Sequence, residues 1–351
     1  MVGRSLEHRS FLVGGIASDE VVVASRFDHP RRGPVSCPAA DLLAEQARDA
    51  GFRARIADIT GARAENPPGG SPTLETASYL DHDDQVFGVG VASSGEGHAS
   101  ALARQLVERW SSVVRTRRAL LAISDSGAEP SGSAGTRVRQ FADRGDTVVV
   151  IGASKSATGT VTAYAPHASI PITAVGDLDS LGELDSEHIS YLVAPGTPME
   201  DAAEIVSALY GRFPRLRGPH PREFVYRASD RREALCSVAA ASDVLLVCGP
   251  RDVPSGPELD SWAARTGCPA HNVSRLGDLK AEWLSGSATV GVAAACEAGA
   301  RIADRITKAL SGLGPLAVLR RRVITEHYRG ADRGSSARPA QEQNGMLTVG
   351  R

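Results

Sequence analysis

The sequence predicts an α/β protein with parallel β-sheets covered by helices. Short apolar stretches alternate repeatedly with helical patterns along the chain, which is typical of parallel sheets. The length of 351 residues favours two or three domains over one. A hydrophobic fraction of 42% with 23% charged residues indicates a globular protein that buries apolar cores.

The first block of elements forms an N-terminal α/β domain, which we place at residues 1–120. It is expected to contain two strands, two helices and the loops that join them. The strands are expected at 19–25 and 85–93, the helices at 37–51 and 98–121, and the loops at 26–36 and 60–75.

Two further blocks repeat this build, a middle α/β domain at 121–215 and a C-terminal one at 216–330. In the middle block, the strand YLVA is followed by the loop PGTP and by a helix that begins with Pro198 and acidic residues, as helix N-termini prefer. Residues 331–351 are polar and are expected to form a disordered tail.

The loops beyond the carboxyl ends of parallel strands form the usual ligand site of such sheets. The sequence therefore predicts a ligand cavity lined by these loops. They are residues 26–36, 152–160, 195–198, 250–256 and 293–299.

Composition excludes several classes of function. A formal net charge of −2 gives no sign of a nucleic-acid or membrane partner. The apolar run at 11–17 is too short for a membrane span and lacks a cleavage site, so we expect a cytoplasmic, monomeric protein. Five widely spaced cysteines without a C-x-x-C pair indicate neither a disulfide framework nor a zinc ribbon. The excess of arginine over lysine, with much Ala and Gly, indicates an actinobacterial source.

Several phrases follow one another in a familiar order. They are RGDTVVVIG at 144–152, YLVAPGTPMEDAAEIVSALYGRFP at 191–214, VYRASDRREA at 225–234 and WLSGSATVGVAA at 283–294. In these phrases the chain resembles the LytB (IspH) family of hydroxymethylbutenyl diphosphate reductases of isoprenoid biosynthesis. The first 120 residues match weakly, chiefly at RRGPVSCPAADLLAEQA. The resemblance implies three small parallel-sheet α/β domains around a central cavity.

The resemblance also implies an iron–sulfur cluster held by three cysteine thiolates. Cys37 falls where the first of these ligands belongs. The second should lie near the junction with the middle domain, but residues 85–135 contain no cysteine. The third position is Val225, which cannot bind iron. The cluster site implied by the family is therefore degenerate in this sequence.

Other positions that carry the family's chemistry also differ. The family's proton-relay phrase Gly-His-Pro-Glu-Val is replaced by ASKSATG, which places Ser156 and Thr158 there. The family's Thr-Thr pair becomes Pro195 and Gly196. The phrases that build the scaffold are kept, and those that perform chemistry are not.

Cys37, Cys296 and His29 are the predicted catalytic residues. Both cysteines lie on loops expected to face the cavity, where they would form a soft metal site or supply a reactive thiol with a lowered pKa. The alternative is that both are small buried residues. His29, close to Cys37 in the sequence, is either a cavity base or a solvated histidine. No metal ligands are assigned.

A ligand site is predicted around Lys155, one of few lysines in the chain. Hydroxyls, backbone amides and one cation after a buried strand suit a phosphate, although a solvated loop lysine is the alternative. Arginine guanidinium groups recognise phosphate oxygens well. The predicted substrate-binding residues are Ser154, Lys155, Ser156, Thr158, Thr197, Tyr226, Arg227, Arg251 and Ser255.

Three interpretations of function remain open, and the sequence leaves open whether the chain is an enzyme. In the first, a repurposed family member without a cofactor binds, or transforms by a non-redox step, a small phosphorylated or isoprenoid-like ligand in specialised metabolism. In the second, the chain is an iron–sulfur reductase whose cluster is held by Cys37, Cys296 and a non-cysteine ligand. In the third, it is a catalytically inactive scaffold or regulatory partner.

Overall fold

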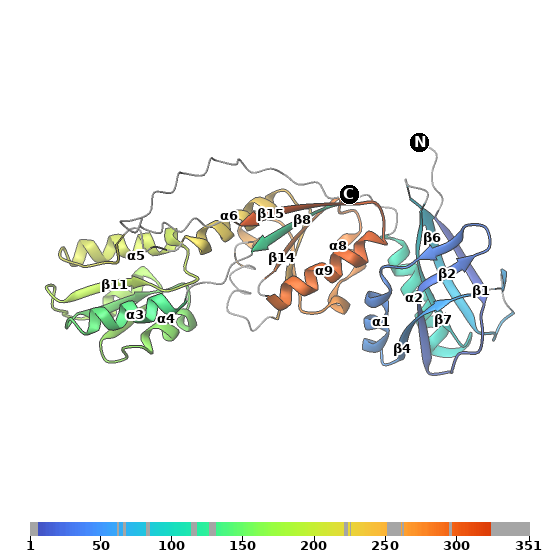
Figure 1. Cartoon of the computed structure of the whole chain (residues 1–351), viewed down its shortest axis with the longest axis horizontal. Helices are drawn as coiled ribbons and strands as arrows, with labels where there is room; N and C mark the ends of the chain where they lie inside the picture. Colours follow the sequence, from blue (N-terminus) through green and yellow to red (C-terminus); the bar gives the residue numbers. More distant parts are fainter. Residues whose placement is uncertain are drawn as a thin grey trace, which may run out of the picture. The chain divides into compact units, whose positions relative to one another are not determined.

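The computed structural model describes residues 6–323, except 62, 66–67, 82–84, 114–117, 126–130, 221–223, 225, 251–260, 262 and 295–296. The expected tail at 331–351 lies outside the described residues. The chain divides into two compact units, of which the first contains residues 1–122 and 238–320, and the second contains 123–237. The described residues form three β-sheets (Figure 1). The division into three domains stays a prediction.

The first sheet lies in the first unit and has seven strands in the order β4-β2-β3-β7-β6-β1-β5. Helices α1 and α2 cover one of its faces, where Val21 and Val91 share a core with Leu42 and Leu106. The strands are β1 (Glu7–Leu12), β2 (Glu20–His29), β3 (Gly33–Ser36), β4 (Arg53–Ile59), β5 (Arg63–Glu65), β6 (Thr73–Leu80) and β7 (Val86–Ser93), and the helices are α1 (Ala40–Asp49) and α2 (Gly97–Ser111).

This first sheet is mixed and not parallel throughout. Only β2–β4 and β3–β7 are parallel pairs, whereas β1–β6, β6–β7 and β2–β3 are antiparallel. Short connections account for β2–β3 and β6–β7, because a parallel pair needs a long crossover and a tight turn joins only antiparallel strands. The expected loop at 60–75 accordingly contains β5 and the start of β6.

The second sheet lies in the second unit and is parallel, with the order β10-β9-β11. The run TVVVI of β9 is continuously apolar because both faces of the sheet are covered: Val149 and Ile151 pack on one side, and Val148 and Val150 on the other. The elements are α3 (Ser131–Ala142), β9 (Thr147–Ile151), α4 (Lys155–Thr162), β10 (Ser169–Ile172), the 3-10 helix η1 (Val175–Leu181), β11 (Ile189–Val193), α5 (Met199–Arg212) and α6 (Arg227–Ala240).

The third sheet, in the order β13-β12-β14-β8-β15, completes the expected α/β class. Its pairs β12–β13, β12–β14 and β14–β8 are parallel. The elements are β8 (Arg118–Asp125), β12 (Val244–Cys248), β13 (Ala270–Val273), η3 (Leu276–Asp278), α8 (Ala281–Leu284), β14 (Thr289–Ala294), α9 (Glu297–Ser311) and β15 (Leu316–Val323).

Strand β8 corrects the expected helix at 98–121. The helix ends at Ser111, and Leu120 pairs with Val290 of β14. Leu120 is fully buried in the core shared by the first and third sheets. The pairing partner lies far away in the sequence, so local periodicity did not indicate a strand.

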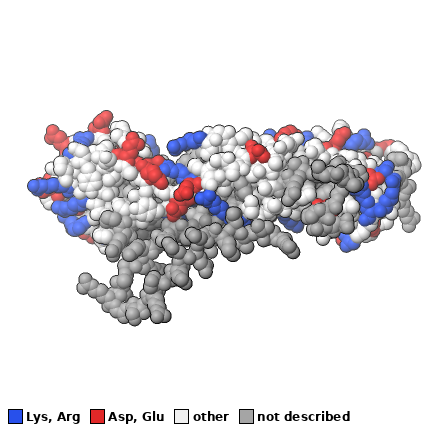
Figure 2. Space-filling model, turned by 90° about the horizontal axis from the view of Figure 1, so that it is seen from above, with Lys and Arg blue, Asp and Glu red and all other residues white. Residues whose placement is uncertain are grey.

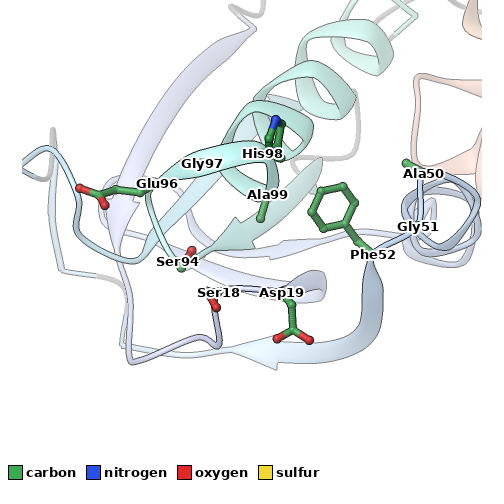
Figure 3. Close-up of a pocket in the computed structure, with 10 residues that line it drawn as sticks. All are labelled: Ser18, Asp19, Ala50, Gly51, Phe52, Ser94, Glu96, Gly97, His98 and Ala99. Atoms are coloured by element: carbon green, nitrogen blue, oxygen red, sulfur yellow. The ribbon is translucent and has the colours of Figure 1, made fainter.

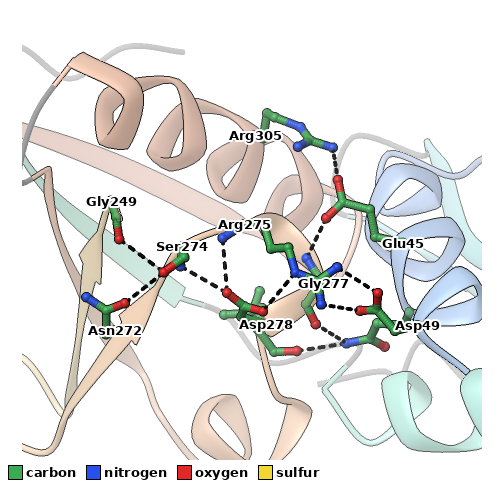
Figure 4. A network of polar contacts seen from close by, with 11 residues as sticks. Glu45, Asp49, Gly249, Asn272, Ser274, Arg275, Gly277, Asp278 and Arg305 are labelled. Carbon is green, nitrogen blue, oxygen red and sulfur yellow. Dashed lines mark hydrogen bonds and ion pairs between the residues drawn. The ribbon is translucent and has the colours of Figure 1, made fainter. Parts of the chain in front are cut away.

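An acidic stripe on α1 joins the first sheet to the third within the first unit. Asp41, Glu45 and Asp49 are four residues apart and therefore lie on one face of the helix. They pair with Lys308 at 3.5 Å, with Arg305 at 2.5 Å and with Arg275 at 2.6 Å, respectively. Figure 4 shows the pairs of Glu45 and Asp49.

The backbone of η3 is also held by α1. The Gly277 N–H donates to Glu45 Oε2 at 2.7 Å, and Gln46 Nε2 donates to the carbonyl oxygens of Gly277 and Leu279 at 3.3 and 2.8 Å. A Cβ at Gly277 would lie only 3.0 Å from Asp49, so glycine permits this close approach. The two sheets thus share one apolar core and one polar border.

The described surface carries charges of both signs. Figure 2 shows Lys and Arg atoms beside Asp and Glu atoms over the described part of one face. Within the described residues, no helix is long and apolar enough to cross a bilayer.

Replacement of Glu45 tests the polar border. Glu45→Ala removes the acceptor of the Gly277 N–H and a partner of Arg305, so we expect the free energy of unfolding to fall by about 1–2 kcal/mol. Asp41→Ala is the matched control on the same stripe; its pair with Lys308 is well exposed, and the expected change is about 0–0.5 kcal/mol. Urea unfolding measures both. Equal losses for the two variants would contradict the role given to Glu45.

Candidate functional site

The carboxyl ends of β9, β10 and β11 meet at one edge of the second sheet. Two of the loops that follow these strands are tied together, because the Ala153 N–H donates to Thr197 Oγ1 at 3.1 Å. The Thr197 side chain is buried, with 3% of the residue exposed. The loops after β9 and β11 are therefore fixed relative to each other before any ligand arrives.

Two of the hydroxyl groups at the start of α4 serve the helix itself. Ser154 is the N-cap, and its Oγ accepts from the Ala157 N–H at 3.2 Å. The buried Thr158 hydroxyl donates to the carbonyl oxygens of Ser154 and Lys155 at 3.3 and 3.2 Å. Lys155 and Ser156 in the first turn are exposed. The exposed polar side chains of this turn are therefore those two.

The loop after β10 supplies a carboxylate near Lys155. Asp177 accepts hydrogen bonds from the Thr173 N–H at 2.8 Å, the Thr173 hydroxyl at 2.9 Å and the Ala174 N–H at 3.0 Å. These bonds lower the pKa of Asp177, and the positive charge of Lys155 lowers it further. An ionised carboxylate thus lies within electrostatic reach of the cation at this edge.

Helix α6 begins against the start of α5. Ser229 Oγ accepts from the Met199 N–H at 2.9 Å and donates to Glu200 Oε2 at 3.0 Å. Arg232 binds Glu200 and Asp201, both at 2.7 Å. Burial opposes the charge of Arg232, but the carboxylates of Asp201 and Glu200 outweigh it and raise the guanidinium pKa. These contacts fix the first turns of α6 on the first turn of α5.

The second unit brings part of the predicted ligand set together. Ser154, Lys155, Ser156, Thr158 and Thr197 lie at the sheet edge; Tyr226 is 48% exposed just before α6, and Arg227 begins that helix. Their roles as ligand-binding residues stay predictions. Val225, Arg251, Ser255 and Cys296 lie outside the described residues.

Sequence reasoning missed Asp177, Ser229 and Arg232. The signal for Asp177 was available: its position three residues after Ala174, behind an apolar strand, is the spacing at which an acidic side chain caps a helix start. The other two act through partners about 30 residues away in the sequence, which no local pattern indicates.

Cys37 does not have the lowered pKa expected from its position before a helix. The residue is 3% exposed and packs in an apolar cluster with Phe27 and Val35. Burial, and then the negative charge of Asp58, raise the pKa of its thiol. The lowered pKa of an activated thiol is therefore not found, and the alternative of a small buried residue fits these surroundings. The catalytic role of Cys37 stays a prediction.

His29 is buried, and so is not the solvated histidine that the sequence allowed. Its Nδ1 accepts from the Arg31 N–H at 3.2 Å, and its Nε2 lies 3.7 Å from Glu7 Oε2. Its ring meets Phe11 edge-on, with 5.4 Å between the centroids. The expected role as a cavity base stays a prediction.

The first unit has an open hollow of about 890 Å³ beside the start of α2. Figure 3 shows Phe52 and Ala99 facing each other across it, with Glu96 pointing away. The other lining residues are Ser18, Asp19, Ala50, Gly51, Ser94, Gly97 and His98. None of the predicted site residues that the structure describes lines this hollow.

Replacement of Arg232 tests how α6 is held. Arg232→Gln removes both ion pairs with α5, so we expect amide exchange in the first turn of α5 to become about five times faster, the effect of roughly 1 kcal/mol. Arg215→Gln is the control, because the Arg215 pair with Glu187 is exposed on both sides. Hydrogen exchange read by mass spectrometry is the measurement. Unchanged exchange in Arg232→Gln would show that the ion pairs do not order this turn.

The chain is similar in sequence to curated proteins named as diphosphate reductases. A 4-hydroxy-3-methylbut-2-enyl diphosphate reductase of Mycobacterium tuberculosis is 32% identical over 191 residues, which cover 54% of this chain and 58% of the relative. The reductase of Sodalis glossinidius is 30% identical over 128 residues, 36% of this chain and 40% of the relative. This chain thus spans less than two thirds of the length of these curated relatives.

A solved structure and a family model also match. The structure of the E-1-hydroxy-2-methyl-but-2-enyl-4-diphosphate reductase of Plasmodium falciparum matches 84% of this chain and 91% of its own, at 16% identity and a TM-score of 0.48. The model of the family described as LytB protein matches residues 130–311, more than half of the chain. This chain therefore belongs to the LytB protein family.

Proposed function

We propose that this chain binds a small diphosphate ester, of the class in its relatives' names, at the carboxyl edge of the second sheet. The observation that carries the proposal is the exposed pair Lys155 and Ser156 at the start of α4, beside loops fixed by the Ala153–Thr197 hydrogen bond. The first N–H groups of a helix have no partner within it, and this end carries a partial positive charge, so both favour a phosphate.

Asp177 limits how strongly this edge attracts an anion. Its pKa is lowered by three hydrogen bonds from its own loop, so it stays ionised at neutral pH and opposes a second negative charge. Lys155 offsets this charge, and the helix N-terminus adds the remaining attraction. We therefore expect modest affinity for inorganic diphosphate alone and stronger binding when the organic part of an ester adds apolar contact.

Reduction of the diphosphate ester is the second candidate. Membership of the LytB family and the names of the matching relatives favour it. It requires the redox group that the family resemblance implies, an iron–sulfur cluster held here by an altered set of ligands. The first proposal, binding of the diphosphate ester, does not require that cluster and assigns the chain a role in specialised metabolism.

Ligand-dependent stability tests the binding proposal. The melting temperature should rise with 4-hydroxy-3-methylbut-2-enyl diphosphate, because a ligand at about 100 times its Kd adds about 2.7 kcal/mol to the native state. Lys155→Ala should reduce this rise, since it removes the exposed cation at the start of α4. Lys280→Ala, at an exposed lysine of the first unit, is the matched control.

The same experiment has two outcomes that count against the proposal. No rise in the wild type with either inorganic diphosphate or the ester would remove the ligand class and favour a scaffold role. An equal rise in wild type and Lys155→Ala would place the ligand elsewhere in the chain. Consumption of the ester coupled to oxidation of a reduced one-electron dye, under anaerobic conditions, would establish the reductase instead.

A further inference from the structure

We infer that Cys37 is a packing residue of the first sheet and not an iron ligand, so the chain does not build the three-thiolate cluster that the family resemblance implies. The inference concerns the first unit and does not depend on diphosphate binding in the second. Its basis is the surroundings of the Cys37 side chain, the charge beside it and the positions of the other cysteines.

The Cys37 side chain is enclosed by the apolar face of the first sheet opposite α1 and α2. Its backbone N–H donates to the Ser25 carbonyl oxygen at 2.9 Å, which holds the residue at the end of the β2–β3 hairpin. The other buried members of its cluster are at most 2% exposed. They are Phe11, Val22, Ala24, Phe27, Val35, Leu74 and Ala92. A cluster could bind Cys37 only if this core opened.

The charge beside Cys37 also opposes a metal-bound thiolate. A cysteine binds iron in its deprotonated form, which is stabilised by nearby cations or by the metal. Here the interacting charge is the carboxylate of Asp58, which the Ser25 hydroxyl holds through a hydrogen bond of 2.5 Å. The enclosed position of the side chain and the nearby carboxylate are therefore both unlike the surroundings of a cluster ligand.

The other cysteines do not replace Cys37 in a described site. The sequence has no cysteine between Cys37 and Cys236. The family resemblance implies that Val225 stands at the third ligand position. Cys248 is fully buried at the end of β12, where burial raises the pKa of its thiol to about 12. Among the residues that the structure describes, no three His, Cys, Asp or Glu side chains are grouped to hold a metal ion.

The test compares the full-length wild type with Cys37→Ala and Cys236→Ala. Each protein is prepared without oxygen and reconstituted with iron and sulfide, then assayed for iron, acid-labile sulfide and visible absorbance. In parallel, iodoacetamide labelling of the folded wild type is followed at each cysteine by mass spectrometry. Cys236 is the matched control for labelling, because it lies on a helix and is only partly buried.

We expect Cys37→Ala to leave the iron and sulfide content of the wild type unchanged. We also expect Cys37 to be labelled at least about tenfold more slowly than Cys236 in the folded protein, and at the same rate after denaturation, because labelling of a buried thiol requires opening. Stoichiometric iron and sulfide in the wild type and in Cys236→Ala, lost in Cys37→Ala, would overturn the inference. Rapid labelling of Cys37 in the folded wild type would also overturn the inference. This measurement does not depend on whether any variant folds.

Discussion

The docking of α1 between the first and third sheets is the constraint on which the first unit depends. Leu42 and Leu43 of α1 and Leu276 of η3 belong to one core, and the acidic stripe of α1 meets Arg275 and Arg305 at its border. These contacts therefore fix the orientation of α1, and of the segment just before it, relative to the two sheets. Cys37, just before this helix, is fixed with it and faces the opposite, apolar side of the sheet.

The second and third sheets end their edge strands with the same turn, but they use it differently. Thr173 and Ala174 donate their N–H groups to Asp177, and Ser274 and Arg275 donate theirs to Asp278. In η3, the Gly277 N–H donates to Glu45 of α1. Gly176, which holds the same place before Asp177 in η1, is exposed. One copy of the turn thus joins two sheets, and the other is exposed at the edge that carries Lys155.

The sequence predicted elements whose signal is local and missed features that depend on distant partners. Apolar periodicity was enough for α1, β9 and α5, and the rule for parallel strands placed Lys155 and Thr197 at one sheet edge. Apolar periodicity did not predict β8, because its strand conformation depends on pairing with β14. It also failed for the Cys37 pKa, because the sequence shows the following helix but not the core into which the thiol points.

One buried polar anchor of the second sheet lies away from its candidate site. Buried Asp146, before β9, accepts from the Ser190 hydroxyl and from Arg217 at 3.1 Å, so this anchor is at the amino ends of the strands. The exposed Lys155 and Ser156 lie at the carboxyl ends. Substitutions of Lys155 and Ser156 themselves therefore cost the scaffold little, since exposed positions away from caps and cores change stability by about 0.5 kcal/mol or less. A fold held in this way accommodates different side chains at its loops, so the fold by itself does not establish the reaction.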